Sequence, residues 1–216
     1  MQLYHRGIRR RLAPMLGNDR RRLELAFSLL FALPGTPMLQ YGDEIGIGDD
    51  LSLPERQCAR TPMQWNQDRH GGFSRADEVV SPVIDDAEYG YQRLNVADQR
   101  RDPGSLLNWT TKMIRGRREC PEISWGEVAL LETRCDEVLA LQYTWRQTQL
   151  VVLHNFASET RTAQLHLGKP GDLLADVFIH DNRQASDGTH EIVLDPYGYR
   201  WFRVGDDDNA LNRSLV

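Results

Sequence analysis

Apolar residues between Asn18 and Leu33 recur at every third or fourth position, as they do on one face of a helix. The positions concerned are Leu23, Ala26, Phe27 and Leu30. Asn18 or Asp19 can cap the start of this helix, and Leu33-Pro34-Gly35 ends it, because a residue before proline disfavours helical geometry. The pattern therefore predicts one helix that buries a single face.

A short apolar run, Thr36 to Tyr41, follows this helix and is bounded by Gly42. It is long enough only for a buried strand or a turn. A helix, a tight connection and a short buried strand are typical of an α/β unit. From Gly42 to Asp102 no period is sustained. A loop of that length in a compact domain is usually functional or wraps other structure.

A second helix is predicted to start at Asp102-Pro103, which supplies an N-cap and a proline at the first helical position. One side of it is apolar, through Leu106, Leu107, Met113 and Ile114. Its end is basic, as the helix dipole favours, through Arg115, Arg117 and Arg118.

After Pro121 the pattern changes to short β-like runs separated by turn-forming clusters. We expect strands at Glu127–Leu131, Val138–Trp145, Gln149–Phe156, Arg161–Leu167, Leu173–Phe178, Glu191–Leu194 and Tyr199–Val204. Seven such runs in about 85 residues predict an antiparallel sandwich. Its boundary with the helical part lies near Cys120, and the last dozen residues are expected to form a frayed acidic tail.

Composition and charge are those of an ordinary globular protein. Of the 216 residues 40% are apolar, whereas disordered chains are poorer in core formers. A formal charge of −5 gives no overall attraction for nucleic acid or anionic membranes, so we expect neither as a partner.

No run approaches the roughly 20 apolar residues of a membrane helix, and no apolar stretch follows the N-terminal arginines as in a secretory signal. A cytoplasmic location is expected.

Arginines cluster at the start of the chain: Arg6, Arg9, Arg10, Arg11, Arg20, Arg21 and Arg22. Such a cluster is compatible with a nucleic-acid-binding surface. Because the arginines flank an apolar-periodic helix and the rest of the chain is acidic, a solvated or ion-paired helix edge is the favoured interpretation.

The sequence indicates no metal site and no cofactor. Three cysteines, Cys58, Cys120 and Cys135, are widely spaced and form no CxxC, which argues against a disulfide framework and against structural zinc. The six histidines show no HxxH or HExxH spacing. No glycine-rich phosphate loop is present either, so a nucleotide cofactor is not expected.

Several runs resemble one known family. The segment Pro34–Gly46 resembles the last strand and following loop of the catalytic barrel of the α-amylase family. Two further runs, Arg60-Thr61-Pro62-Met63-Gln64-Trp65 and Gly71-Gly72-Phe73-Ser74, are similar to the signature of its α-glucosidase and trehalose synthase branch. Within that branch the trehalose synthases (maltose α-D-glucosyltransferases) are most similar, through Arg9–Leu16, Gly48–Arg56 and Pro196–Trp201.

The resemblance implies an α/β plus all-β fold class, in which the C-terminal segment of a (β/α)8 barrel precedes an antiparallel β-sandwich domain. Residues 1–119 would form the last part of the catalytic barrel with a long substrate-side loop, 120–205 the sandwich, and 206–216 an acidic tail. A whole barrel takes about 250 residues, so this sequence has room only for the closing segment.

The resemblance also implies retaining α-glucosyl transfer on maltose or a related α-glucoside. That reaction needs a carboxylate nucleophile, a carboxylic acid and a glucosyl-enzyme intermediate. In a trehalose synthase the released glucose turns over in a closed pocket, so water must be excluded. The family carries its nucleophile in a GFRxD-like strand, its acid in a later strand and a third carboxylate in an NHD motif, and neither motif occurs here. No catalytic residue is assigned, and the chain alone is predicted to be inactive.

Six residues are candidates for the site. The resemblance implies that Arg60 reaches the glucose at the cleavage site, where a guanidinium can grip adjacent hydroxyls; the alternative is that it ties the loop to the barrel. Arg56 supports the same pocket or only the loop. Asp43 and Glu44, which we expect on an extended segment and pointing opposite ways, are interpreted as supporting or loop-anchoring groups. Trp65 and Phe73 either stack on a sugar ring or anchor the loop.

Two partners are expected in a complete enzyme: an α-glucoside such as maltose or trehalose, and either the missing N-terminal barrel piece or a second copy of the chain. Unpartnered barrel-facing residues such as Phe27, Leu30 and Met38 would favour such association. The alternatives are a glucan-binding or barrel-stabilising module without chemistry, a piece of a close α-glucosidase, and nucleic-acid binding through the N-terminal arginines.

Overall fold

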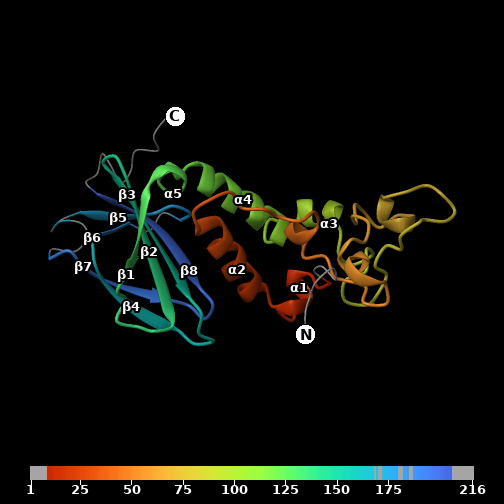
Figure 1. The fold of residues 1–216 in the computed structure, drawn as a ribbon, viewed down its shortest axis with the longest axis horizontal. Coiled ribbons are helices and arrows are strands. Elements are labelled where there is room, and N and C mark those ends of the chain that lie inside the picture. Colours follow the sequence, from red (N-terminus) through yellow and green to blue (C-terminus); the bar gives the residue numbers. More distant parts are fainter. Residues whose placement is uncertain (1–8, 168, 170–171, 180–181, 185–186, 206–216) are drawn as a thin grey trace. The chain divides into compact units, whose positions relative to one another are not determined.

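Helices come first along the chain and strands follow (Figure 1). The computed structural model describes residues 9–167, 169, 172–179, 182–184 and 187–205. Two units are formed, one from Met1–Leu23 and Met38–Lys112, the other from Glu24–Pro37 and Met113–Val216. The expected acidic tail, 206–216, lies outside the described residues. Among the described helices, none is long and apolar enough to cross a membrane.

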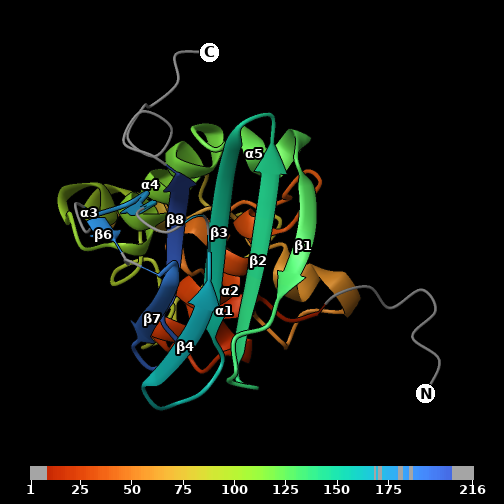
Figure 2. The ribbon, with the colours of Figure 1, turned by 90° about the vertical axis from the view of Figure 1, so that its left-hand side faces the viewer.

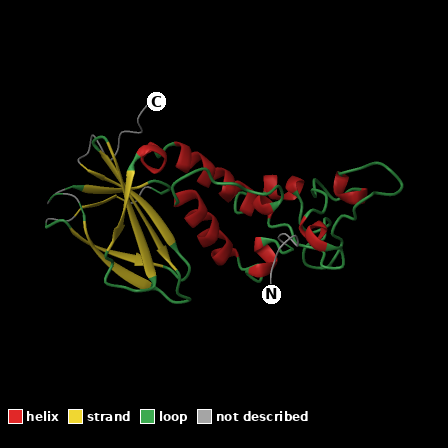
Figure 3. Cartoon of the chain, in the orientation of Figure 1, coloured by secondary structure: helices red, strands yellow, loops and turns green. Residues whose placement is uncertain are grey.

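Loop makes up most of the first unit (Figure 3). Its regular elements are α1 (Leu12–Met15), the start of α2 (Arg20–Ala32), η1 (Asp43–Ile45), η2 (Glu55–Ala59), η3 (Arg69–Gly72), α3 (Val96–Arg101) and most of α4 (Leu106–Arg118). A small apolar core holds it together, formed by Ile45, Ile47, Met63, Ile84 and Val96. The sequence pattern did not predict α3, which begins after Asn95, whose side chain accepts a hydrogen bond from the Asp98 N–H.

The first predicted helix is present as α2. Of the two candidate caps it is Asp19 that acts, because its Oδ1 accepts hydrogen bonds from the N–H groups of Arg21 and Arg22. The buried face differs from the predicted one: Leu23 and Phe27 are buried, Ala26 and Leu30 are only half-buried, and Leu25 and Phe31, outside the predicted set, are buried.

The second predicted helix begins later than expected. Pro103 and Gly104 form a turn, which the Asp102 carboxylate closes by accepting a hydrogen bond from the Gly104 N–H. The helix α4 starts at Leu106, and the hydroxyl of Ser105 accepts from the Asn108 N–H. The Asp-Pro pair therefore initiates a turn, and Ser105 is the cap.

The strand that was one interpretation of Thr36–Tyr41 is not formed, although all of these residues are described. Strands in the described part of the chain lie between Glu127 and Gly205, so this segment has no neighbouring strand with which to form a ladder. Met38 is 85% exposed.

Two antiparallel sheets form most of the second unit. Their strands are β1 (Glu127–Leu131), β2 (Val138–Trp145), β3 (Thr148–Asn155), β4 (Arg161–His166), β5 (Leu173–Asp176), β6 (Asn182–Gln184), β7 (Thr189–Leu194) and β8 (Tyr199–Gly205). Six strands follow the order β1-β2-β3-β8-β5-β6, and β4 pairs with β7 (Figure 2). All seven predicted strands are present within a few residues, and β6 is the additional one.

A single apolar core is shared by the two sheets. Strict alternation of buried and exposed positions along β7 turns Ile192 and Leu194 inward. They meet Ala163 and Leu165 of the same small sheet and apolar residues of the larger one, namely Val138, Ala140, Val151, Leu153, Leu174, Phe202 and Val204.

The C-terminal part of α2 belongs to this second unit because it is bonded to the large sheet. Ser28 Oγ lies 3.0 Å from His154 Nε2 and accepts a hydrogen bond of 3.0 Å from Trp201 Nε1. The Tyr143 hydroxyl donates to the carbonyl of Ala32. These buried bonds explain why the division of the structure runs through α2 and α4, whereas the sequence predicted one boundary near Cys120.

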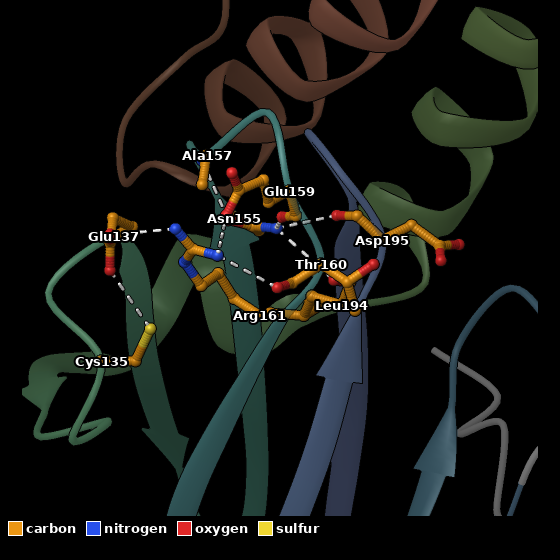
Figure 4. Close-up of polar contacts among 9 residues, drawn as sticks. All are labelled: Cys135, Glu137, Asn155, Ala157, Glu159, Thr160, Arg161, Leu194 and Asp195. Atoms are coloured by element: carbon orange, nitrogen blue, oxygen red, sulfur yellow. Dashed lines mark hydrogen bonds and ion pairs between the residues drawn. The ribbon is translucent and has the colours of Figure 1, made fainter.

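Asn155 joins the end of β3 to two loops (Figure 4). Its Nδ2 donates to the carbonyls of Glu159 (2.8 Å) and Asp195 (2.9 Å), and its Oδ1 accepts from the Ala157 N–H (2.9 Å). Beside it, Arg161 forms ion pairs with two carboxylates, those of Glu137 at 3.3 Å and Glu159 at 2.8 Å. The pair His154-Asn155 thus has a packing role at the edge of the core.

We predict that His154 makes the second unit acid-sensitive. Burial lowers the pKa of His154 from 6.5 to about 4, so the unfolded chain binds a proton that the native chain does not. Stability should be lost as pH falls from about 6.5 towards 4, by up to about 1.4 kcal/mol per pH unit. Urea unfolding at pH 7, 6 and 5 should show a shallower dependence for His154→Gln than for the unchanged chain and the exposed control His166→Gln. Equal slopes for all three would contradict this role.

We also predict that Asn155→Asp destabilises the second unit by about 1–3 kcal/mol at neutral pH, because two carbonyls lose a donor and face a carboxylate. Asn182→Asp, at an exposed position of β6, is the matched control and should change the free energy of unfolding little. Equal effects of the two substitutions in urea unfolding would show that Asn155 does not hold these loops.

Candidate functional site

A pocket of about 740 Å³ lies in the loops of the first unit. Its lining comes from the Tyr41–Glu44 turn, from the run Arg60–Trp65 and from the loop that follows: Tyr41, Glu44, Arg60, Pro62, Met63, Trp65, Phe73, Ser74, Ala76, Glu78, Val79, Val80 and Ser81. The walls are mainly apolar, with a few charged groups and hydroxyls. This is the usual character of a small-molecule site.

Four of the six predicted residues come together here: Glu44, Arg60, Trp65 and Phe73 all line the pocket. Asp43 and Arg56 do not line it. These four predicted residues are up to 29 positions apart in the sequence, counted from Glu44 to Phe73.

Arg60 follows η2 directly and is exposed, between the buried residues Ala59 and Thr61. Within the described residues its guanidinium forms no hydrogen bond or ion pair, so its donors are available to a ligand. The backbone on either side is fixed, because Gln40 Nε2 donates to the Ala59 carbonyl (2.9 Å) and the Tyr41 hydroxyl to the Thr61 carbonyl (3.0 Å).

The run that carries Arg60 and Trp65 is held by Gln64, whose side chain is fully buried. Gln64 Nε2 donates to the carbonyls of Tyr89 (2.8 Å) and Leu94 (2.6 Å). The Trp65 N–H donates to the Gly71 carbonyl at 2.7 Å. Buried side-chain amides thus replace a strand ladder, and the indole of Trp65 is left at the surface.

Trp65 and Phe73 present their rings to the pocket. They are 47% and 54% exposed, which leaves ring surface for a ligand. Before Phe73 the backbone turns through positive φ angles at His70 (54°) and Gly71 (64°). Such aromatic faces pack well against the apolar face of a pyranose.

The adjacent acids Asp43 and Glu44 lie on η1, not on an extended segment as expected. The turn before them needs glycine, since Gly42 has a φ of 90° and an added Cβ would lie 2.6 Å from Ile47 Cγ2. Glu44 Oε2 accepts from the Gly42 N–H at 2.7 Å. Asp43 faces a different partner, Arg11, at 3.0 Å. The two carboxylates therefore do not act as a facing pair.

Arg56 lies exposed on η2 and outside the pocket lining. Glu55 just before it has a positive φ of 47°, which turns this part of the loop sharply. Nothing in the described structure brings Arg56 to the other candidates.

Sequence reasoning missed part of the pocket. Tyr41 could have been predicted, because it lies with Asp43 and Glu44 in the run that resembles the α-amylase family. The opposite wall, formed by Glu78 to Ser81, follows no period and belongs to no motif. Only its place in three dimensions reveals it.

The charged groups of the pocket are one guanidinium, on Arg60, and two carboxylates, on Glu44 and Glu78. Near the unit's core, burial together with the Glu88 hydrogen bond and charge raises the pKa of Tyr89 to about 12, so that phenol stays neutral. The arrangement can bind a polyhydroxylated ligand by stacking and by charge-assisted hydrogen bonds.

Comparisons with known proteins match both parts of the chain. The family described as alpha amylase, catalytic domain, matches residues 9–126, and the sucrose hydrolase-like C-terminal domain matches residues 148–203. A trehalose synthase of Pimelobacter sp. is 38% identical over 94% of this chain and 37% of its own length. A trehalose synthase/amylase of Mycobacterium tuberculosis is 48% identical over 62% of this chain and 23% of its own length. The chain thus spans little more than a third of the length of the first of these relatives and less than a quarter of the second.

Solved structures show the same fold at low identity. A trehalose-6-phosphate hydrolase from Bacillus licheniformis matches with a TM-score of 0.72 and 20% identity, over 91% of this chain and 41% of that one. An α-amylase from H. orenii matches with a TM-score of 0.69 and 22% identity, over 90% of this chain and 38% of that one.

These matches confirm the resemblance and the fold class that the motifs predicted: a barrel segment followed by a β-rich C-terminal domain. Because the catalytic-domain family covers more than half of its residues, the chain belongs to the α-amylase family.

Proposed function

We propose that the chain is the C-terminal part of a trehalose synthase-like enzyme, which interconverts maltose and trehalose by retaining intramolecular α-glucosyl transfer. The proposal is supported by relatives named trehalose synthase at 38% identity over most of this chain. On this proposal the first unit supplies substrate-binding groups, and the second is the β-rich domain that accompanies the barrel.

One observation carries the proposal: Arg60, with no partner in the described structure, shares a pocket with Trp65 and Phe73. A planar guanidinium can bind two adjacent hydroxyls of a glucosyl unit, and exposed rings can cover its apolar face. Glu44 lies in the same pocket and adds an acceptor for a sugar hydroxyl.

The chemistry itself requires groups from elsewhere. Retaining transfer uses two carboxyl groups about 5–5.5 Å apart, one as nucleophile and one as acid. The GFRxD-like motif that carries the nucleophile in the family is absent from this sequence, as is the NHD motif that carries a third carboxylate. We therefore propose that the chain alone is inactive, and that a barrel piece bearing those carboxylates docks onto it.

On this proposal the long loop of the first unit would also exclude water from the pocket. Isomerisation competes with hydrolysis, because water can capture the glucosyl-enzyme as readily as the released glucose. The apolar wall at Val79 and Val80 suits the exclusion of water from a closed pocket. A closely related α-glucosidase would differ in this respect and release glucose.

Reconstitution tests the proposal. The barrel portion of the Pimelobacter trehalose synthase that precedes its match to this chain is produced separately and mixed with it. We expect trehalose from maltose with the mixture and none with either part alone. Glucose as the sole product would instead assign an α-glucosidase. Maltose binding by the chain alone, with no activity in a folded mixture, would assign a glucan-binding module.

In the active mixture we predict that Arg60→Ala lowers kcat/KM for maltose by about ten- to a hundredfold, because a charge-assisted hydrogen bond is worth about 1.5–3 kcal/mol. Arg60→Lys keeps the charge but not the planar fork and should recover only part of the loss. The matched control is Arg101→Ala, which removes an arginine whose side chain is 81% exposed and lies outside the pocket lining. Equal activity of the Arg60 and Arg101 variants would remove Arg60 from the site.

A further inference from the structure

The arginines near the start of the chain bind its own loop. Arg9 Nη2 donates to the Leu51 carbonyl at 3.2 Å and lies 3.4 Å from Cys58 Sγ. Arg10 Nε donates to Asp49 Oδ2 at 2.8 Å. The favoured interpretation of ion-paired arginines therefore describes Arg10, but its pair lies across a loop and not along a helix edge, whereas Arg9 is hydrogen-bonded to the loop.

Arg11 is the buried member of this group, with a side chain only 1% exposed. Its Nη1 donates to the carbonyl of Tyr41 (2.8 Å) and to Asp43 Oδ1 (3.0 Å). Its Cζ lies 5.2 Å from the centroid of the Tyr41 ring, within the range of a cation–π contact. One guanidinium thus holds the main chain, the carboxylate and the aromatic ring of a single turn.

Stability is a poor explanation for this arrangement. The Nε and Nη2 atoms of Arg11 are buried and have no hydrogen-bond partner among the described residues. A buried donor without a partner is destabilising, and a buried ion pair often stabilises no more than apolar residues of the same volume. Arg11 instead fixes the position of the turn, through its contacts with the Tyr41 carbonyl, the Tyr41 ring and the Asp43 carboxylate.

That turn leads directly to Arg60. Asp43 Oδ2 accepts a hydrogen bond from the Gln40 N–H at 3.1 Å. The Gln40 side chain then donates to the carbonyl just before Arg60, and the Tyr41 hydroxyl to the carbonyl just after it. The carbonyls of Ala59 and Thr61, the residues on either side of Arg60, are therefore bonded to the turn that Arg11 holds.

We infer that Arg11 is a positioning residue of the pocket, which sets the guanidinium of Arg60 through the Gln40–Asp43 turn. Its effect on catalysis rests on the proposed function, whereas its effect on pocket geometry does not. Lysine can take its place only in part, since a single ammonium lacks the fork that spans a carbonyl and a carboxylate.

A double-mutant cycle in the reconstituted enzyme tests the catalytic part. Arg11→Met should lower kcat/KM for maltose by about tenfold when Arg60 is present, and by less than twofold in the Arg60→Ala background, because the residue that it positions is gone. A merely structural role of Arg11 would give the same factor in both backgrounds, and that result would overturn the inference.

A spectroscopic measurement on the chain by itself tests the geometric part. The indole N–H resonance of Trp65, assigned with Trp65→Phe, should shift in Arg11→Met and less in Arg11→Lys, and stay in place in Arg101→Ala. The Trp201 indole, bonded to Ser28 in the other unit, should not move in any of them and serves as the internal control.

The outcomes separate the two proposals. An unmoved Trp65 resonance in both Arg11 variants would overturn the inference. A Trp65 resonance that moves as expected supports the positioning role of Arg11. An inactive mixture beside it would contradict only the proposed function. If Arg11→Met loses the dispersed resonances of the first unit, Arg11→Lys decides by the same criterion.

Discussion

The first unit depends on one constraint: a loop of some sixty residues must satisfy its backbone polar groups without a sheet ladder. Buried and half-buried side chains do this instead. Gln64 binds two carbonyls, and Gln99 donates to the Ile45 carbonyl while its Oε1 accepts from the Leu107 N–H. The pocket keeps its shape because these bonds join segments that are distant in sequence.

The same constraint explains which parts of the fold could be predicted. The strand β7 can be predicted from its alternation of buried and exposed positions, because it has one face on the core. Along β2 residues of both faces are buried, so its mainly apolar run, and not alternation, predicts it. The strand β6 has three residues and pairs only with β5, so it leaves no period. Helix α3 lacks an apolar stripe, and its one local signal, the cap Asn95, is no stronger than many turn residues.

The candidate site was predictable where its residues share a motif. Arg60, Trp65 and Phe73 stand in runs that resemble a family signature, and the structure places them in one pocket. Arg11 was hidden among neighbouring arginines, because its burial is a property of the folded loop and not of its sequence context. Arg56 shows the reverse: proximity in sequence to Arg60 does not place it in the pocket.

The central claim is that this chain binds the glucosyl unit while the carboxylates that react with it lie outside its sequence. A fluorinated glucosyl fluoride, which forms a slowly hydrolysed ester with the nucleophile of a retaining enzyme, tests this directly in the reconstituted mixture. Peptide mass spectrometry should find the label on the barrel piece and none on this chain. A label on any carboxylate of this chain, Glu44 above all, would contradict the account.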